Sequence, residues 1–220
     1  MPIVLVAAGA VVILMLKGGD AGGILDGITG GSHEDDNAVP PFEFRLSKTG
    51  VVATVEDADL DAMRTQAGTV AEEITPLLDD LYTNAFLDPT NWREGDYEEI
   101  FTIFATDALA SAREGIETLT LGATAGDVYE RVTPRRGSLR FRVLFDQEGA
   151  PDTVVVQVSF TALGQRQDGT YTAIVSSGEL FLNDVGGWKV TAFDVSRADH
   201  ATKPPPSPTP SGSTSASPTA

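Results

Sequence analysis

The hydrophobic periodicity of this 220-residue chain changes near Asp127, and this change restricts the fold more than any other feature of the sequence. Before this point, apolar residues recur every three or four positions, which is the spacing of amphipathic helices. After it, apolar and polar residues alternate, which is the spacing of strands with one buried face. Helices that precede a run of strands indicate an α+β fold rather than alternating strand and helix units.

The helical half is expected to contain two or three helices. The first spans residues 60–81, and Pro76 should kink it or divide it near Thr75. Residues 87–95 are expected to form a turn. A second helix should start at Asp96, where Glu99 three positions later resembles a capping box, and should run to residue 108. A short third helix should occupy 107–113 and end at a glycine.

The second half is expected to form a curved antiparallel sheet, with the helices packed on one face. Strands are predicted at 139–145, 154–160, 171–182 and 188–195, with a bulge near Ser177 and Gly178. The gaps between them are short and rich in turn residues, so neighbouring strands should be antiparallel. Further strands at 128–132 and within 41–56 would bring the total from four to six, although 41–56 could equally be an ordered lead-in.

The N-terminal residues 1–17 are predicted to form a single-pass membrane anchor. Residues 2–16 carry no charge, but they fall short of the roughly 20 residues that cross a bilayer. A signal peptide would need a basic start and a small-residue cleavage site, and a core element would not be followed by so many glycines. Lys17 favours the opposite orientation under the positive-inside rule. The acidic body and the tail nevertheless place the body outside the cytoplasm in our interpretation.

Two segments have compositions that disfavour a packed core. Residues 18–40 are rich in glycine and acidic residues and are predicted to form a flexible linker. Residues 201–220 consist mainly of Pro, Ser and Thr and are predicted to form a disordered tail. Between these segments, residues 57–200 are long enough to fold without a disulfide or a metal, in keeping with the absence of cysteine.

The net charge of −17 is concentrated in the helical half of the chain. Residues 56–117 contain 16 acids and three bases (net −13), whereas residues 127–200 contain ten acids and eight bases (net −2). Such an anionic surface repels phosphate backbones, so we expect no nucleic-acid partner. Five arginines form the basic cluster of the strand half and could bind an acidic partner or another copy of the chain: Arg131, Arg135, Arg136, Arg140 and Arg142.

Three weak motifs carry a resemblance to a known superfamily, over about residues 57–199. They are Trp92-Arg-Glu-Gly-Asp-Tyr97, Leu119-Thr-Leu-Gly122, and the Gly187-Trp-Lys-Val190 strand with Phe193-Asp-Val195. Together with the order of helices and strands, they resemble the nuclear transport factor two-like (cystatin-like cone) superfamily. With an N-terminal anchor, the chain is similar to envelope-associated members of actinobacteria and to assembly factors of type IV secretion systems. The resemblance implies an interaction or scaffold role, and isomerases and cyclases of the superfamily provide the alternative.

No catalytic residue is predicted, and no metal or cofactor is expected. Both histidines, His33 and His200, lie outside the expected core, which disfavours a zinc site or a Ser-His-Asp triad. If the cone were open, Asp194 could act as a base, because it shares strand parity with Trp188. The residues expected to line such a pocket are Tyr82, Trp92, Tyr97, Phe101, Phe104, Trp188 and Asp194. We therefore expect a non-catalytic interaction module of the cell envelope, with a small-molecule binder or isomerase as the alternative.

Overall fold

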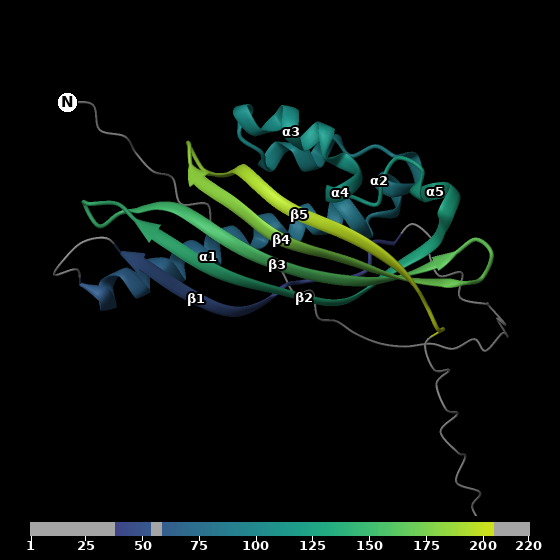
Figure 1. Cartoon of the computed structure of the whole chain (residues 1–220), viewed down its shortest axis with the longest axis horizontal. Helices are drawn as coiled ribbons and strands as arrows, with labels where there is room; N and C mark the ends of the chain where they lie inside the picture. Colours follow the sequence, from purple (N-terminus) through teal and green to yellow (C-terminus); the bar gives the residue numbers. More distant parts are fainter. Residues whose placement is uncertain (1–37, 54–58, 205–220) are drawn as a thin grey trace, which may run out of the picture. The chain divides into compact units, whose positions relative to one another are not determined.

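The computed structural model describes residues 38–53 and 59–204, which belong to one compact unit. A helical layer lies on one face of a five-stranded sheet whose strand order is β1-β2-β3-β4-β5 (Figure 1). The α+β class is therefore confirmed. The expected anchor, nearly all of the linker and the tail from residue 205 lie outside the described residues. Within the described part of the chain, no helix is both long and apolar enough to span a bilayer.

Four long strands form the antiparallel meander that the alternating pattern predicts. They are β2 (Tyr129–Phe145), β3 (Pro151–Arg166), β4 (Tyr171–Asp184) and β5 (Trp188–Thr202). Each strand extends beyond its predicted bounds, because polar residues continue the backbone pairing past the apolar core. The strand expected at 128–132 is the first part of β2, which continues through a register shift between Pro134 and Arg136.

The edge strand β1 (Arg45–Ala53) lies beside β2 and runs parallel to it. Arg45 pairs with Ser138, so the partners are separated by the entire helical region. A parallel pair needs such a crossover, because a short hairpin can join only antiparallel strands. The segment 41–56 thus contains an edge strand, one of the two outcomes left open by the sequence.

The first helix, α1 (Leu60–Tyr82), begins where the Asp59 carboxylate accepts hydrogen bonds from the backbone N–H groups of Asp61 and Ala62. Pro76 lies inside α1 without dividing it, so of the two expected outcomes the division near Thr75 was wrong. Proline removes one backbone N–H, the one that would have bonded to the carbonyl of Glu72. Both residues are exposed, so water can serve the freed carbonyl. The helix buries a stripe of apolar side chains against the sheet: Met63, Ala67, Val70, Ala71, Ile74, Leu78 and Leu81.

The turn expected at 87–95 is mostly helical. A π-helical turn (Thr83–Leu87) leads into α2 (Pro89–Glu94). The Asp88 carboxylate caps α2 by accepting a 2.8 Å hydrogen bond from the backbone of Thr90, and Pro89 occupies the first turn, where its missing N–H costs little. Gly95 ends the helix in the left-handed conformation. The residues that cap α2 can be recognised in the sequence, but the helix is too short for its apolar residues to show a helical period.

The helix expected at 96–108 is replaced by shorter pieces. A 3-10 helix spans Glu98–Ile103, a second 3-10 turn spans Thr106–Ala108, and Phe104 between them is extended. Its neighbour Ala105 donates a 2.9 Å backbone hydrogen bond to Val190 of β5, so pairing with the sheet ends the helix. The third helix is confirmed as α3 (Leu109–Glu114), followed by α4 (Ile116–Leu119) and α5 (Ala125–Val128).

An irregularity of the sheet lies at a different residue from the one predicted. β4 pairs with β3 without any register shift, so there is no bulge at Ser177 and Gly178. The shift falls instead in β5, where Thr191 is the extra residue opposite the Phe181–Leu182 step of β4. Position 178 needs glycine for a different reason: a Cβ there would lie 2.6 Å from the Cα of Val195.

Candidate functional site

The sheet has one face that points away from α1, and we call it the open face. Figure 1 shows α1 behind the sheet and α2 to α5 toward one border, with no described helix lying over the other face. Outward side chains of β2 to β5 lie directly opposite one another in rows that cross all four strands. The outward side chains of the open face therefore form regular rows, each with one residue from each of the four strands.

The central row consists entirely of serines. Ser138 pairs with Ser159, Ser159 with Ser177, and Ser177 with Ser196, so one hydroxyl side chain comes from each of β2, β3, β4 and β5. We call this set the serine row. Because serine is small, the row lowers the sheet surface and forms the floor of a hollow of about 620 Å³.

The next row carries charge of opposite sign at its two ends. We call it the charged row, and in strand order it consists of Arg140, Gln157, Glu179 and Asp194. Arg140 and Asp194 also border the hollow. Among the described residues, neither side chain makes a hydrogen bond or an ion pair, so both remain available to a partner.

The predicted arginine cluster lies along β2. Arg135, Arg136, Arg140 and Arg142 are all exposed, and Arg142 pairs with Glu179 of β4 at 2.8 Å. Arg135 and Arg136 border a second hollow beside the segment that precedes β1. Arg131 stands apart from these four and lines the apolar hollow described below. All five arginines thus lie on β2, four of them between residues 135 and 142.

Asp194 faces outward, away from the helices. The inward placement considered above depended on unbroken alternation from Trp188 to Asp194, and the extra residue at Thr191 interrupts it. Phe193 and Val195 contact the core instead, while Asp194 is exposed. Trp188 is half-buried, and its indole N–H donates a 3.1 Å hydrogen bond to Glu73 of α1. Asp194 and Trp188 therefore do not share a pocket.

The remaining aromatic candidates are part of the packed core. Tyr82, Tyr97, Phe101 and Phe104 are each no more than 8% exposed. The Tyr82 hydroxyl lies 3.2 Å from Ser176 Oγ, and the Tyr97 hydroxyl donates to the carbonyl oxygen of Gly122 at 3.1 Å. Burial raises the pKa of Tyr82 to about 12 and raises the pKa of Tyr97 well above its ordinary value. Both phenols are thus protonated at physiological pH, and neither can act there as a phenolate base.

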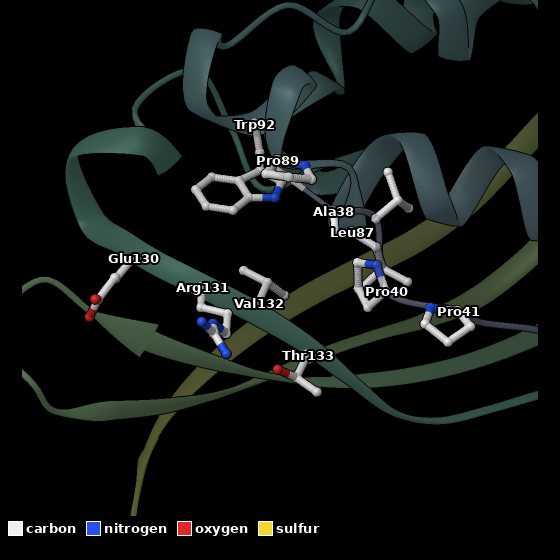
Figure 2. Close-up of a pocket in the computed structure, with 11 residues that line it drawn as sticks. Ala38, Pro40, Pro41, Leu87, Pro89, Trp92, Glu130, Arg131, Val132 and Thr133 are labelled. Carbon is white, nitrogen blue, oxygen red and sulfur yellow. The ribbon is translucent and has the colours of Figure 1, made fainter. Parts of the chain in front are cut away.

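Trp92 lines an apolar hollow of about 380 Å³ between α2, the start of β2 and the segment that precedes β1 (Figure 2). Leu87, Pro89 and Val132 form its walls, and Pro40 and Pro41 border its mouth. The indole nitrogen is buried without a hydrogen-bond partner among the described residues. An unpaired buried donor is costly, and Trp92 as a whole is only 1% exposed.

Two further features were not predicted from the sequence. The serine row is one, because its members come from four strands and no short motif joins them. The other is Arg197, whose guanidinium binds the Glu117 carbonyl at 3.0 Å and the Asp199 carboxylate at 2.9 Å, thereby connecting β5 to α4. Among the described residues, no cluster of three His, Cys, Asp or Glu side chains is suited to hold a metal ion.

Comparisons with known proteins add no relative to this description. No protein-family model, curated protein or solved structure matches the chain. The likeness to the cystatin-like cone superfamily therefore stays a prediction, and the features of the described residues that bear on function are the open face and the apolar hollow beside Trp92.

Proposed function

We propose that this chain is a non-catalytic interaction module that binds a protein partner through its open face. Its apolar N-terminal segment would hold it in the cell membrane with the body outside the cytoplasm. The observation that carries the proposal is the charged row: Arg140 and Asp194 are exposed, have no bonding partner among the described residues, and stand on a sheet face that no described helix covers. Groups of this kind steer and orient protein association more than they stabilise a fold.

The packing of the core also supports an interaction role over catalysis. Tyr82, Phe86 and Phe160 contact one another, with ring centroids 5.1 to 5.4 Å apart, in the space where an isomerase-type site was considered. Asp194, the base considered for such a site, lies on the opposite side of the sheet. On the open face, Arg142 pairs with Glu179 and the Ser196 hydroxyl donates to the carbonyl oxygen of Ser177, whereas Arg140 and Asp194 make no such bond among the described residues.

Site-specific photo-cross-linking in intact cells tests the proposal. A photoreactive residue at Ser159, in the centre of the open face, should yield a cross-linked product. The same residue at Gln66, on the exposed side of α1, is the matched control and should yield little. Equal yields at both positions, or no product at Ser159, would contradict the proposal.

Protease added to intact cells tests the orientation, because a body outside the cytoplasm should be degraded.

A second candidate function is the binding of a small apolar ligand beneath Trp92. The hollow that Leu87, Trp92 and Val132 help to line is the observation that favours it, because small-molecule sites are concave and mostly apolar. Since the chain has two tryptophans, Trp188→Phe leaves Trp92 as the sole indole fluorophore. Titration with medium-chain ketones should then change the Trp92 emission saturably. Thr133→Phe, at the edge of the hollow, should weaken that response, and an unchanged spectrum would exclude these ligands.

A further inference from the structure

The open face is complementary to itself. Positive charge lies on its β2 side, where Arg136, Arg140 and Arg142 are exposed, and negative charge lies toward β4 and β5, where Glu179 and Asp194 stand. A surface divided in this way can pair with a copy of itself when a two-fold axis brings opposite sides together. A second copy as the partner would deepen the proposed function, on which this inference rests.

One two-fold axis satisfies this requirement. An axis parallel to the strands, above the boundary between β3 and β4, places β2 of one copy over β5 of the other and β3 over β4. Such a rotation keeps every row opposite itself. Arg140 of each copy then faces Asp194 of the other copy, so the opposite charges at the two ends of the charged row compensate each other twice.

The neighbouring rows fit the same arrangement. In the serine row, Ser138 faces Ser196 and Ser159 faces Ser177 across the axis, so small hydroxyl side chains meet and let the two sheets approach. In the row on the other side of the charged row, Val155 faces Phe181 of the second copy. This apolar pair would gain burial from association, because Phe181 is only half-buried in a single chain.

Other arrangements of two copies place like charges together. An axis perpendicular to the strands stacks β2 on β2 and brings arginines of one copy against arginines of the other. Contact through α1 would oppose two acidic surfaces, because residues 56–117 carry a net charge of −13 and residues 127–200 only −2. Like charges that face each other across an interface repel and suppress such pairings.

The size of the open face agrees with a stable dimer. Four strands about 4.8 Å apart and about six outward positions per strand, roughly 6.8 Å apart, cover ~750 Å². A standard protein interface buries about 800 Å² on each partner. We propose that the occupant of the open face is a second copy of this chain, related by a two-fold axis parallel to β3 and β4.

Disulfide cross-linking of the full chain in its membrane tests this arrangement, because the protein has no cysteine of its own. In the variant Ser138→Cys with Ser196→Cys, the two thiols of one chain lie three strands apart, roughly 14 Å, and cannot join. Across the proposed axis they face each other, so mild oxidation should produce covalent dimers. Each single-cysteine variant should produce few, because its thiol faces a serine.

Charge reversal supplies the second measurement in the same double-cysteine background. Arg140→Asp should lower the dimer yield about tenfold, and adding Asp194→Arg should restore it. Dimer yields that are equal in the single- and double-cysteine variants, or that ignore the charge changes, would overturn the proposed axis. If no covalent dimer forms but Ser159 still cross-links to a different protein, self-association fails while the interaction role stands. If neither product forms, both fail.

Discussion

Tyr82 of α1 and Ser176 of β4 meet inside the core, with their hydroxyl oxygens 3.2 Å apart. Both side chains are almost completely buried, at 3% and 0% exposure. The contact joins α1 to β4, so substitutions at these two residues test how much it contributes to the stability of the packing between helix and sheet.

Removing both members of this pair should cost less than the sum of the two single removals. Tyr82→Phe leaves the Ser176 hydroxyl without a partner, and Ser176→Ala leaves the Tyr82 hydroxyl unpaired, so each should lower the free energy of unfolding by about 1–2 kcal/mol. The double variant should lose less than the sum of the two, as shown by urea unfolding. Strict additivity would mean that the hydroxyl contact contributes nothing to stability.

The buried tyrosines predict a loss of stability at alkaline pH. Burial raises the pKa of both Tyr82 and Tyr129 to about 12. Between about pH 10 and pH 12, the unfolded chain therefore releases these protons while the folded chain retains them, so stability should fall as the pH rises. Tyr82→Phe should make this slope shallower. Unfolding monitored by circular dichroism from pH 8 to pH 12 would show the difference.

Gly178→Ala should destabilise the pairing of β4 with β5. The added Cβ would collide with the carbonyl oxygen of Asp194 and with Val195 Cα. Because both contacts are backbone, they cannot rotate away, and we expect a loss of about 1–3 kcal/mol in unfolding free energy. Gly68→Ala is the matched control: nothing lies within 4 Å of its Cβ, and alanine in a helix should add about 0.5–1 kcal/mol.

The ionisation of Asp79 should lower the stability of the fold, whereas the ionisation of a salt-bridged acid raises it. Its carboxylate accepts a 2.7 Å hydrogen bond from the Phe44 backbone, but partial burial dominates and raises the pKa of Asp79. A raised pKa means that stability is lost as the pH rises through the interval just above 3.8. Asp79→Asn should therefore gain stability relative to the wild type between pH 4 and pH 7.

Urea titrations at several pH values would measure that gain. Asp80→Asn, which removes a charge from the exposed side of the same turn, controls for the general repulsion among acids. A gain for Asp79→Asn no larger than that for Asp80→Asn would show that burial of the carboxyl is not the cause.

Periodicity was sufficient to predict the fold class and the positions of the four meander strands, because those patterns depend on which side chains face a single core. The short helices between residues 83 and 128 could not be placed in this way. Their ends are set by tertiary contacts, such as the hydrogen bond from Ala105 to Val190, and by caps such as Asp88. The extra residue at Thr191 is likewise visible only once β5 is paired with β4.

The candidate site was harder to predict than the fold. The sequence indicated the arginines of β2, because they cluster along the chain. It could not show that Ser138, Ser159, Ser177 and Ser196 lie side by side, because that depends on the register of three separate strand pairs. The outward position of Asp194 depended on a single inserted residue.

The parallel placement of β1 has a consequence for how the protein folds during synthesis. Arg45 pairs with Ser138, so the edge strand must wait until more than 90 further residues have been made before its partner exists. Closing such a long loop is slow relative to forming the hairpins between consecutive strands from β2 to β5, whose contacts are local. We therefore expect the meander to form first and β1 to add last, which makes the docking of β1 the step most exposed to misassembly.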